Sequence, residues 1–90
     1  MNLSEQIDIV NKLGLHARAA SKLVKLASEF DCELTIEKDE QSVSCKSIMG
    51  VMMLAAGCGS TVTLMADGHD APQAMSALKD LINRRFDEDE

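Results

Sequence analysis

Apolar and polar side chains alternate in four segments of this chain, and no other feature limits its fold as strongly. A period of two places every second side chain on the same face, which is typical of a β-strand with one buried face. The segments are residues 3–10, 32–37, 41–45 and 61–66. The side chains predicted to face the core are Leu3, Ile7, Ile9, Cys32, Leu34, Ile36, Val43, Val62, Leu64 and Ala66.

Three further segments have apolar residues spaced by three and four positions, which predicts helices. They are residues 17–29, the apolar run IMGVMMLAA that follows Ser47, and the segment that follows Asp70. Ser47 is a suitable N-cap for the second helix, and Asp70 with Gln73 forms a capping-box-like pair for the third. The apolar face of the third helix comprises Ala71, Ala74, Met75, Leu78, Leu81 and Ile82.

The resulting element order is β-α-β-β-α-β-α. Half-polar strands indicate an antiparallel sheet with one face in water and helices covering the other. We therefore predict an α+β fold: a two-layer, open-faced β-sandwich with a four-stranded antiparallel sheet and three helices on one face. The 90 residues predict one domain, residues 1–86. The acidic tail, residues 87–90, is expected to be frayed and solvated.

Composition excludes several classes of function. The net charge of −6 argues against binding a phosphate backbone. The two Phe, with no Trp or Tyr, argue against stacking on nucleic-acid bases. No apolar run reaches the length of a membrane span, and the acidic N-terminus lacks the basic region of a signal peptide. We expect a cytoplasmic protein with neither nucleic-acid binding nor membrane insertion.

The cysteines and one of the histidines receive structural interpretations. Cys32, Cys45 and Cys58 match neither a zinc spacing nor a CxxC motif, so we expect small buried or half-buried thiols and no metal. His69 lies in a Gly-His-Asp turn, where nothing near it in sequence suggests a ligand or a base.

The stretch GLHARAA, residues 14–20, is a candidate phosphoryl site. His16 falls at or next to the N-cap of the first helix, where free backbone N–H groups and the positive end of the helix dipole favour anions. An imidazole nitrogen can act as a nucleophile, and Arg18 can add a guanidinium to the phosphoryl oxygens. The alternative is that His16 is an exposed loop residue and Arg18 an ordinary surface charge.

The charges around His16 are unusual for so acidic a chain. Between Ile9 and Ser28 there are four basic residues and no acidic ones. A local positive patch of this kind favours docking to an acidic protein surface, although a solvated basic helix face would give the same pattern. The four residues are Lys12, Arg18, Lys22 and Lys25.

The apolar run after Ser47 is the second candidate site. A short helix in so small a domain cannot bury all its sides, so some of its large side chains should be exposed and available to several partners. The alternative is that they fill an aromatic-poor core. Ser47 is either an ordinary N-cap or a regulatory phosphorylation site at a helix N-terminus. The side chains in question are Ile48, Met49, Met52 and Met53.

Two segments together resemble the histidine-containing phosphocarrier family, HPr, of the bacterial phosphoenolpyruvate-dependent sugar phosphotransferase system. NKLGLHARAASKLVKLA (residues 11–27) is similar to the active-site loop and first helix of the family. SCKSIMGVMMLAAGCGSTVTL (residues 44–64) is similar to its serine-phosphorylation segment and following strand. The resemblance extends over nearly the whole chain.

The resemblance implies a carrier rather than an enzyme, a monomer without a cofactor. His16 would accept a phosphoryl group on Nδ1 from enzyme I and pass it to an enzyme IIA domain. Arg18 would stabilise the phosphate, with the backbone of Ala17 and Arg18 cradling it. Ser47 would be phosphorylated by HPr kinase/phosphorylase. The side chains expected to contact the partner proteins are those of Leu15, Lys22, Lys25, Ile48, Met49 and Met52.

Two details depart from the usual family pattern. Ala19 stands where the family has proline after the arginine, and we expect transfer to survive this change. The ending Phe86 to Glu90 resembles the nitrogen-related paralogue of the family, so a sugar-transporting and a regulatory role both stay open. Two further hypotheses are a regulatory protein that binds without carrying phosphate and a ferredoxin-like domain that binds a small molecule.

Overall fold

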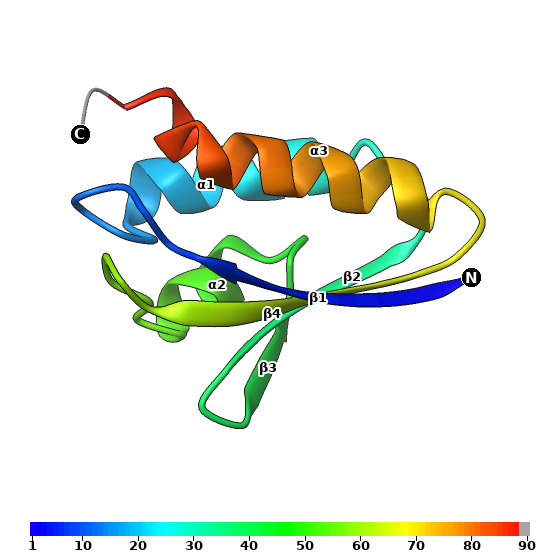
Figure 1. Ribbon diagram of the computed structural model, residues 1–90, viewed down its shortest axis with the longest axis horizontal. Coiled ribbons are helices and arrows are strands. Elements are labelled where there is room, and N and C mark those ends of the chain that lie inside the picture. Colours follow the sequence, from blue (N-terminus) through cyan, green and yellow to red (C-terminus); the bar gives the residue numbers. More distant parts are fainter. Residues whose placement is uncertain (89–90) are drawn as a thin grey trace.

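The computed structural model describes residues 1–88 and has the predicted element order (Figure 1). One short 3-10 turn, η1, follows the last helix and was not expected. Boundaries differ from the predicted ones by one to three residues at most ends. The elements are β1 (Asn2–Asp8), α1 (Ala17–Ala27), β2 (Glu33–Lys38), β3 (Gln41–Ser44), α2 (Ile48–Met53), β4 (Thr61–Asp67), α3 (Ala71–Asn83) and η1 (Arg85–Asp87).

The four strands form one antiparallel sheet in the order β1-β4-β2-β3. β4 pairs with strands on both sides: its Val62 is opposite Ile7 of β1, and its Leu64 is opposite Ile36 of β2. α1 and α3 lie side by side over one face of the sheet (Figure 1). The shorter α2 contacts α1 and β3. The predicted open-faced α+β sandwich is confirmed.

The alternation of apolar residues correctly identifies the core. Eight of the ten side chains predicted to face inward from the strands are buried, and Leu3 and Val43 are partly buried against the same cluster. All six residues of the predicted apolar face of α3 are buried. With few aromatic residues available, aliphatic side chains fill this space, and Phe86 is a completely buried aromatic side chain.

The two predicted helix caps have different outcomes. The Ser47 hydroxyl oxygen accepts a hydrogen bond from the backbone N–H of Gly50 at 3.1 Å, which confirms it as the N-cap of α2. The Asp70 carboxylate makes no cap bond, so the predicted capping box is wrong. Its two oxygens accept instead from the backbone N–H groups of Asp31 and Cys32, at 2.8 and 2.9 Å. These bonds, chiefly the one from Asp31, lower the pKa of Asp70 and tie the start of α3 to the loop before β2.

The three cysteines differ in their burial. Cys32 and Cys45 are buried, as expected. Burial raises the pKa of the Cys45 thiol to about 12, so this thiol is not a nucleophile at neutral pH. Cys58 is exposed, contrary to the expectation of a buried or half-buried thiol, because the turn that carries it lies outside the core.

No helix within residues 1–88 is long and apolar enough to cross a membrane.

The loop between β1 and α1 is held against the turn before β4 by close backbone contact at Gly14. Gly14 has φ +66°, and its N–H donates to the carbonyl of Asn11 at 3.1 Å. A Cβ at this position would lie 2.5 Å from the carbonyl oxygen of Ala56. The next residue, Leu15, donates its N–H to that same oxygen at 2.9 Å. Glycine is therefore required both for its backbone angle and for its lack of a side chain.

We predict that Gly14→Ala lowers the free energy of unfolding by more than about 1 kcal/mol, because it combines a strained angle with a backbone collision. Chemical denaturation measures the change. Gly57→Ala is the matched control, since a Cβ at Gly57 would meet nothing within 4 Å. Equal denaturation midpoints for the two variants would contradict this account of the loop.

Candidate functional site

His16 occupies the N-cap position of α1, with extended backbone angles of φ −76° and ψ 178°. Its carbonyl accepts from the N–H of Ala20 at 2.8 Å, which closes the first turn. The side chain makes no cap bond and is 27% exposed. The N–H groups of the first turn, at residues 17–19, have no acceptor within the helix. The imidazole therefore stands beside a set of free donors at the positive end of the helix.

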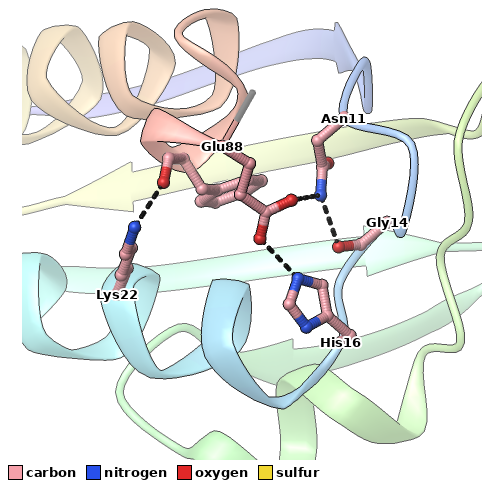
Figure 2. A network of polar contacts seen from close by, with 6 residues as sticks. Asn11, Gly14, His16, Lys22 and Glu88 are labelled. Atoms are coloured by element: carbon pink, nitrogen blue, oxygen red, sulfur yellow. Dashed lines mark hydrogen bonds and ion pairs between the residues drawn. The ribbon is translucent and has the colours of Figure 1, made fainter. Parts of the chain in front are cut away.

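A short segment near the end of the described chain crosses to this helix. We call residues 85–88 the C-terminal strap. Arg85, Phe86 and Asp87 have φ values of 59°, 55° and 61°, so the strap turns in the left-handed sense. The Phe86 ring is fully buried, and its carbonyl accepts from Nζ of Lys22 on α1 at 2.6 Å. Figure 2 shows the ammonium group of Lys22 at the strap and the Glu88 carboxylate next to His16.

Glu88 links the loop and the helix through both of its carboxylate oxygens (Figure 2). Oε2 lies 2.5 Å from Nε2 of His16. Oε1 accepts from Nδ2 of Asn11 at 3.0 Å, and the same Nδ2 donates to the carbonyl of Gly14 at 2.8 Å. Asn11 is completely buried and the Glu88 side chain is 12% exposed. Asn11 thus holds the Glu88 carboxylate and the Gly14 turn in fixed relation.

The environment of Glu88 keeps its carboxylate ionised. Burial raises the pKa of Glu88, but hydrogen bonds from Asn11 and His16 and the positive charges of His16 and Lys22 oppose it, and the net pKa is lowered. An ionised carboxylate can only accept hydrogen bonds, so Nε2 of His16 is the donor. The expectation of a solvated tail is wrong for Glu88, because this hydrogen-bond network compensates its burial. Asp89 and Glu90 lie outside the described residues.

The basic residues around His16 have different surroundings. Arg18 and Lys25 are exposed, and within residues 1–88 the side chain of neither makes a hydrogen bond or an ion pair. Lys22 is half-buried because its ammonium group binds the strap. Ala17 is exposed at the first position of α1. Leu15 is only 5% exposed, so its side chain packs in the core and does not belong to a docking surface; this part of the docking prediction needs correction.

The predicted exposure of the second helix is confirmed. Ile48, Met49, Met52 and Met53 are 42%, 70%, 39% and 66% exposed, and together we call them the methionine patch. Val51, on the opposite side of α2, is buried. Ser47 is exposed beside the patch, and α2 contacts α1, which carries the basic residues. The helix that carries the methionine patch is therefore packed against the helix that carries Arg18 and Lys25.

Sequence reasoning missed Asn11 and Glu88, and it described His69 too simply. Asn11 lies within the loop motif, and a polar residue between β1 and the Gly14 turn is a signal that could have identified it. Glu88 has no local signal, since its partners lie more than seventy positions away. Nε2 of His69 lies 3.7 Å from Oδ2 of Asp31 and close to Asp70, so a carboxylate from a distant loop joins the Gly-His-Asp turn, which the sequence around His69 did not indicate. Both the His69 and the Asp31 side chains are strongly exposed, and this cluster is separate from His16.

Comparison with known proteins gives a consistent result. The family model described as "PTS HPr component phosphorylation site" matches residues 3–84. The phosphocarrier protein HPr of Cupriavidus necator is 54% identical over 98% of this chain and 99% of its own length. The phosphocarrier protein NPr of Shewanella violacea is 51% identical over 96% of this chain and 94% of its own. A crystal structure of HPr from Thermoanaerobacter tengcongensis superposes with a TM-score of 0.94, at 44% identity, over 98% of this chain and 99% of that chain.

We predict that the Glu88 contacts stabilise the fold at neutral pH and that this contribution disappears in acid. A carboxyl group whose pKa is lowered on folding stabilises the native state above its ordinary pKa, about 4.5, and loses that effect as the pH falls through the lower native value. The free energy of unfolding of the wild type should therefore exceed that of Glu88→Gln at neutral pH. The gap should shrink below pH 4.5. A gap independent of pH would show that the charge of Glu88 contributes nothing.

Proposed function

The chain belongs to the HPr family of phosphocarrier proteins of the phosphotransferase system, and we propose that it carries a phosphoryl group on Nδ1 of His16. The donor is phosphorylated enzyme I and the acceptor a histidine of an enzyme IIA domain. Proteins of this family are carriers and not catalytic enzymes. The observation that carries the proposal is the position of His16: partly exposed at the N-terminus of α1, with one ring nitrogen turned away from Glu88 (Figure 2).

The surroundings of that nitrogen suit a phosphoryl group. Free N–H groups at Ala17 and Arg18 and the positive end of the α1 dipole stabilise negative oxygens. The Arg18 guanidinium has no partner among the described residues, so it can bind two phosphoryl oxygens without breaking an existing contact. This preorganised positive environment supports transfer, in which the protein positions the group and compensates charge.

Ala19 is compatible with this role. It lies in the first turn of α1 and is completely buried. The proline usual in the family would fix φ there and remove an N–H. Alanine adopts the same helical angle at a cost of at most about 1 kcal/mol in chain entropy and retains that N–H as a further donor near His16. We therefore expect transfer to survive, with an altered rate or partner preference.

The proposed docking surface combines the methionine patch with the neighbouring positive charges. Ile48, Met49 and Met52 supply exposed apolar contact area, and Arg18 and Lys25 supply charge for an acidic partner. Lys22 contributes less, since its ammonium group already binds the strap. Leu15 does not contact partners in this proposal. Its buried side chain and its backbone bond to Ala56 hold the loop before α1 in place. The carrier domain, predicted from the sequence as residues 1–86 with an acidic segment 87–90, is extended here to Glu88, because Glu88 binds Asn11 and His16. We propose a cytoplasmic monomer; similar solved structures include an HPr dimer.

Ser47 is the proposed regulatory site for HPr kinase/phosphorylase. Its hydroxyl is exposed at the N-terminus of α2, directly beside the methionine patch. A phosphate there is well tolerated by the helix, and it places negative charge next to the surface that partners contact. The NPr relative keeps a second role open, in which the same chemistry serves a regulatory phosphotransfer chain instead of sugar uptake.

The carrier proposal predicts an acid-labile phosphohistidine when the protein is incubated with phosphoenolpyruvate and an enzyme I. His16→Ala should abolish it completely, because the nucleophile is lost. His69→Ala is the matched control, since His69 is the other histidine of the chain and lies in a separate exposed cluster. Phosphate detected by ³¹P NMR in the His16→Ala variant, or absent from the wild type, would refute the proposal.

The regulatory proposal predicts that Ser47→Asp weakens binding of enzyme I by about tenfold, because it places a charge beside the methionine patch. The fold should stay intact, since aspartate is also a good N-cap. Ser47→Asn is the control: it keeps a capping side chain without the charge. Titration calorimetry with enzyme I gives the affinities. Equal affinities for the wild type and both variants would remove Ser47 from the regulatory scheme.

A further inference from the structure

We propose that Glu88 is a positioning residue that keeps a proton on Nε2 of His16 throughout the transfer cycle, so that Nδ1 both receives and releases the phosphoryl group. The inference rests on the proposed carrier function and adds a residue to it. The C-terminal strap then takes part in the chemistry of the site through Glu88. The contact also gives a physical reason why Nδ1 of His16 carries the phosphoryl group and Nε2 does not.

The two nitrogens of the His16 ring have different surroundings. The Glu88 carboxylate lies 2.5 Å from Nε2 and covers that edge of the imidazole. Figure 2 shows Nδ1 on the other side, pointing away from the strap. Within residues 1–88 no hydrogen bond reaches Nδ1. A phosphoryl group can therefore approach Nδ1 without displacing any contact, whereas approach to Nε2 would require Glu88 to leave.

The direction of the hydrogen bond between Glu88 and His16 fixes the position of the ring proton. A carboxylate accepts and cannot donate, so Nε2 carries the hydrogen and the neutral ring has its lone pair on Nδ1. That lone pair attacks the phosphorus and forms the new N–P bond. The N–P bond of the donor phosphohistidine breaks, and its electron pair stays on the donor ring. No proton has to leave Nε2 of His16 during this step.

The same contact acts on the phosphorylated state of His16. With phosphate on Nδ1 and hydrogen on Nε2, the ring carries a positive charge, which the ionised Glu88 stabilises directly. When the acceptor histidine attacks, the His16 N–P bond breaks and its electron pair returns to Nδ1. Because Nε2 still holds its proton, the leaving group is neutral imidazole rather than an imidazolate anion. The carboxylate thus favours loading and release by the same contact.

The Glu88 carboxylate is held in place from two sides. Asn11 donates to its second oxygen, and Asn11 is itself completely buried and bound to the Gly14 carbonyl. Phe86 and Lys22 fix the strap from the other side. Among the described residues, Glu88 from the strap contacts the ring directly, and the ammonium group of Lys22 from α1 binds the strap beside it; Arg18 is two residues along the chain from His16. Asp87, although adjacent in sequence, binds Nε of Arg84 at 3.1 Å.

The first test uses protein phosphorylated on His16 by phosphoramidate, which needs no partner protein. ¹⁵N NMR follows the Nε2 proton as the pH is raised. In the wild type this proton should persist to a pH about one unit or more higher than in Glu88→Gln, because a neighbouring negative charge favours the charged ring. Asp87→Asn is the matched control and should behave as the wild type. Identical profiles for the wild type and Glu88→Gln would overturn the inference.

The second test measures transfer between the protein and enzyme I by rapid quench. Glu88→Gln should slow transfer roughly 10- to 100-fold, whereas Asp87→Asn should not. The buried Phe86 ring reports in ¹H NMR that the strap remains docked. If all three proteins are phosphorylated at equal rates, the role of Glu88 is refuted and the carrier function still stands. A wild type that enzyme I does not phosphorylate would instead refute the carrier function, while the phosphoramidate experiment would still decide on Glu88.

Discussion

Antiparallel pairing of β4 on both of its edges is the constraint on which the rest of the structure depends. β4 bonds to β1 on one side and to β2 on the other, and thereby joins segments from the beginning, middle and later part of the chain. Its inward residues Val62, Leu64 and Ala66 lie under the helices. The pairing continues into the loops, where the N–H of Ile9 donates to the carbonyl of Ser60 and the carbonyl of Ile9 accepts from the N–H of Gly59, both at 2.8 Å. The loop that presents His16 is therefore an extension of the sheet rather than a free connection.

The electrostatics of the site differ from those that the linear sequence indicates. The segment from residue 10 to residue 27 has basic residues and no acidic ones, which correctly indicates an exposed positive surface at Arg18 and Lys25. Folding then brings one acid, Glu88, to the edge of the His16 ring. The site is consequently not uniformly positive. It has positive groups where the phosphoryl oxygens would lie, and among residues 1–88 the carboxylate of Glu88 is bound to the opposite nitrogen.

How much the sequence predicts depends on whether the signal is local. Strand and helix faces repeat along the chain, so residues such as Ile36 and Leu78 are correctly placed in the core. Ser47 is correctly predicted as a cap because its partner, Gly50, is three residues away. Asp70 has its partners in a distant loop, and Glu88 has its partners in the loop before α1. No periodicity encodes such contacts, and the left-handed turn through Arg85 and Asp87 occurs at residues without the usual glycine signal.

The close contact at Gly14 has a consequence for protein engineering. The backbone that presents His16 is shaped by the carbonyl of Ala56, by the amide of Asn11 and, through Asn11, by Glu88. The seven residues of GLHARAA alone therefore do not determine the backbone conformation that they have in this protein. Grafted onto an unrelated scaffold, it would transfer the imidazole and the guanidinium without the three supports that orient them. The smallest transplantable unit of this site is close to the whole domain.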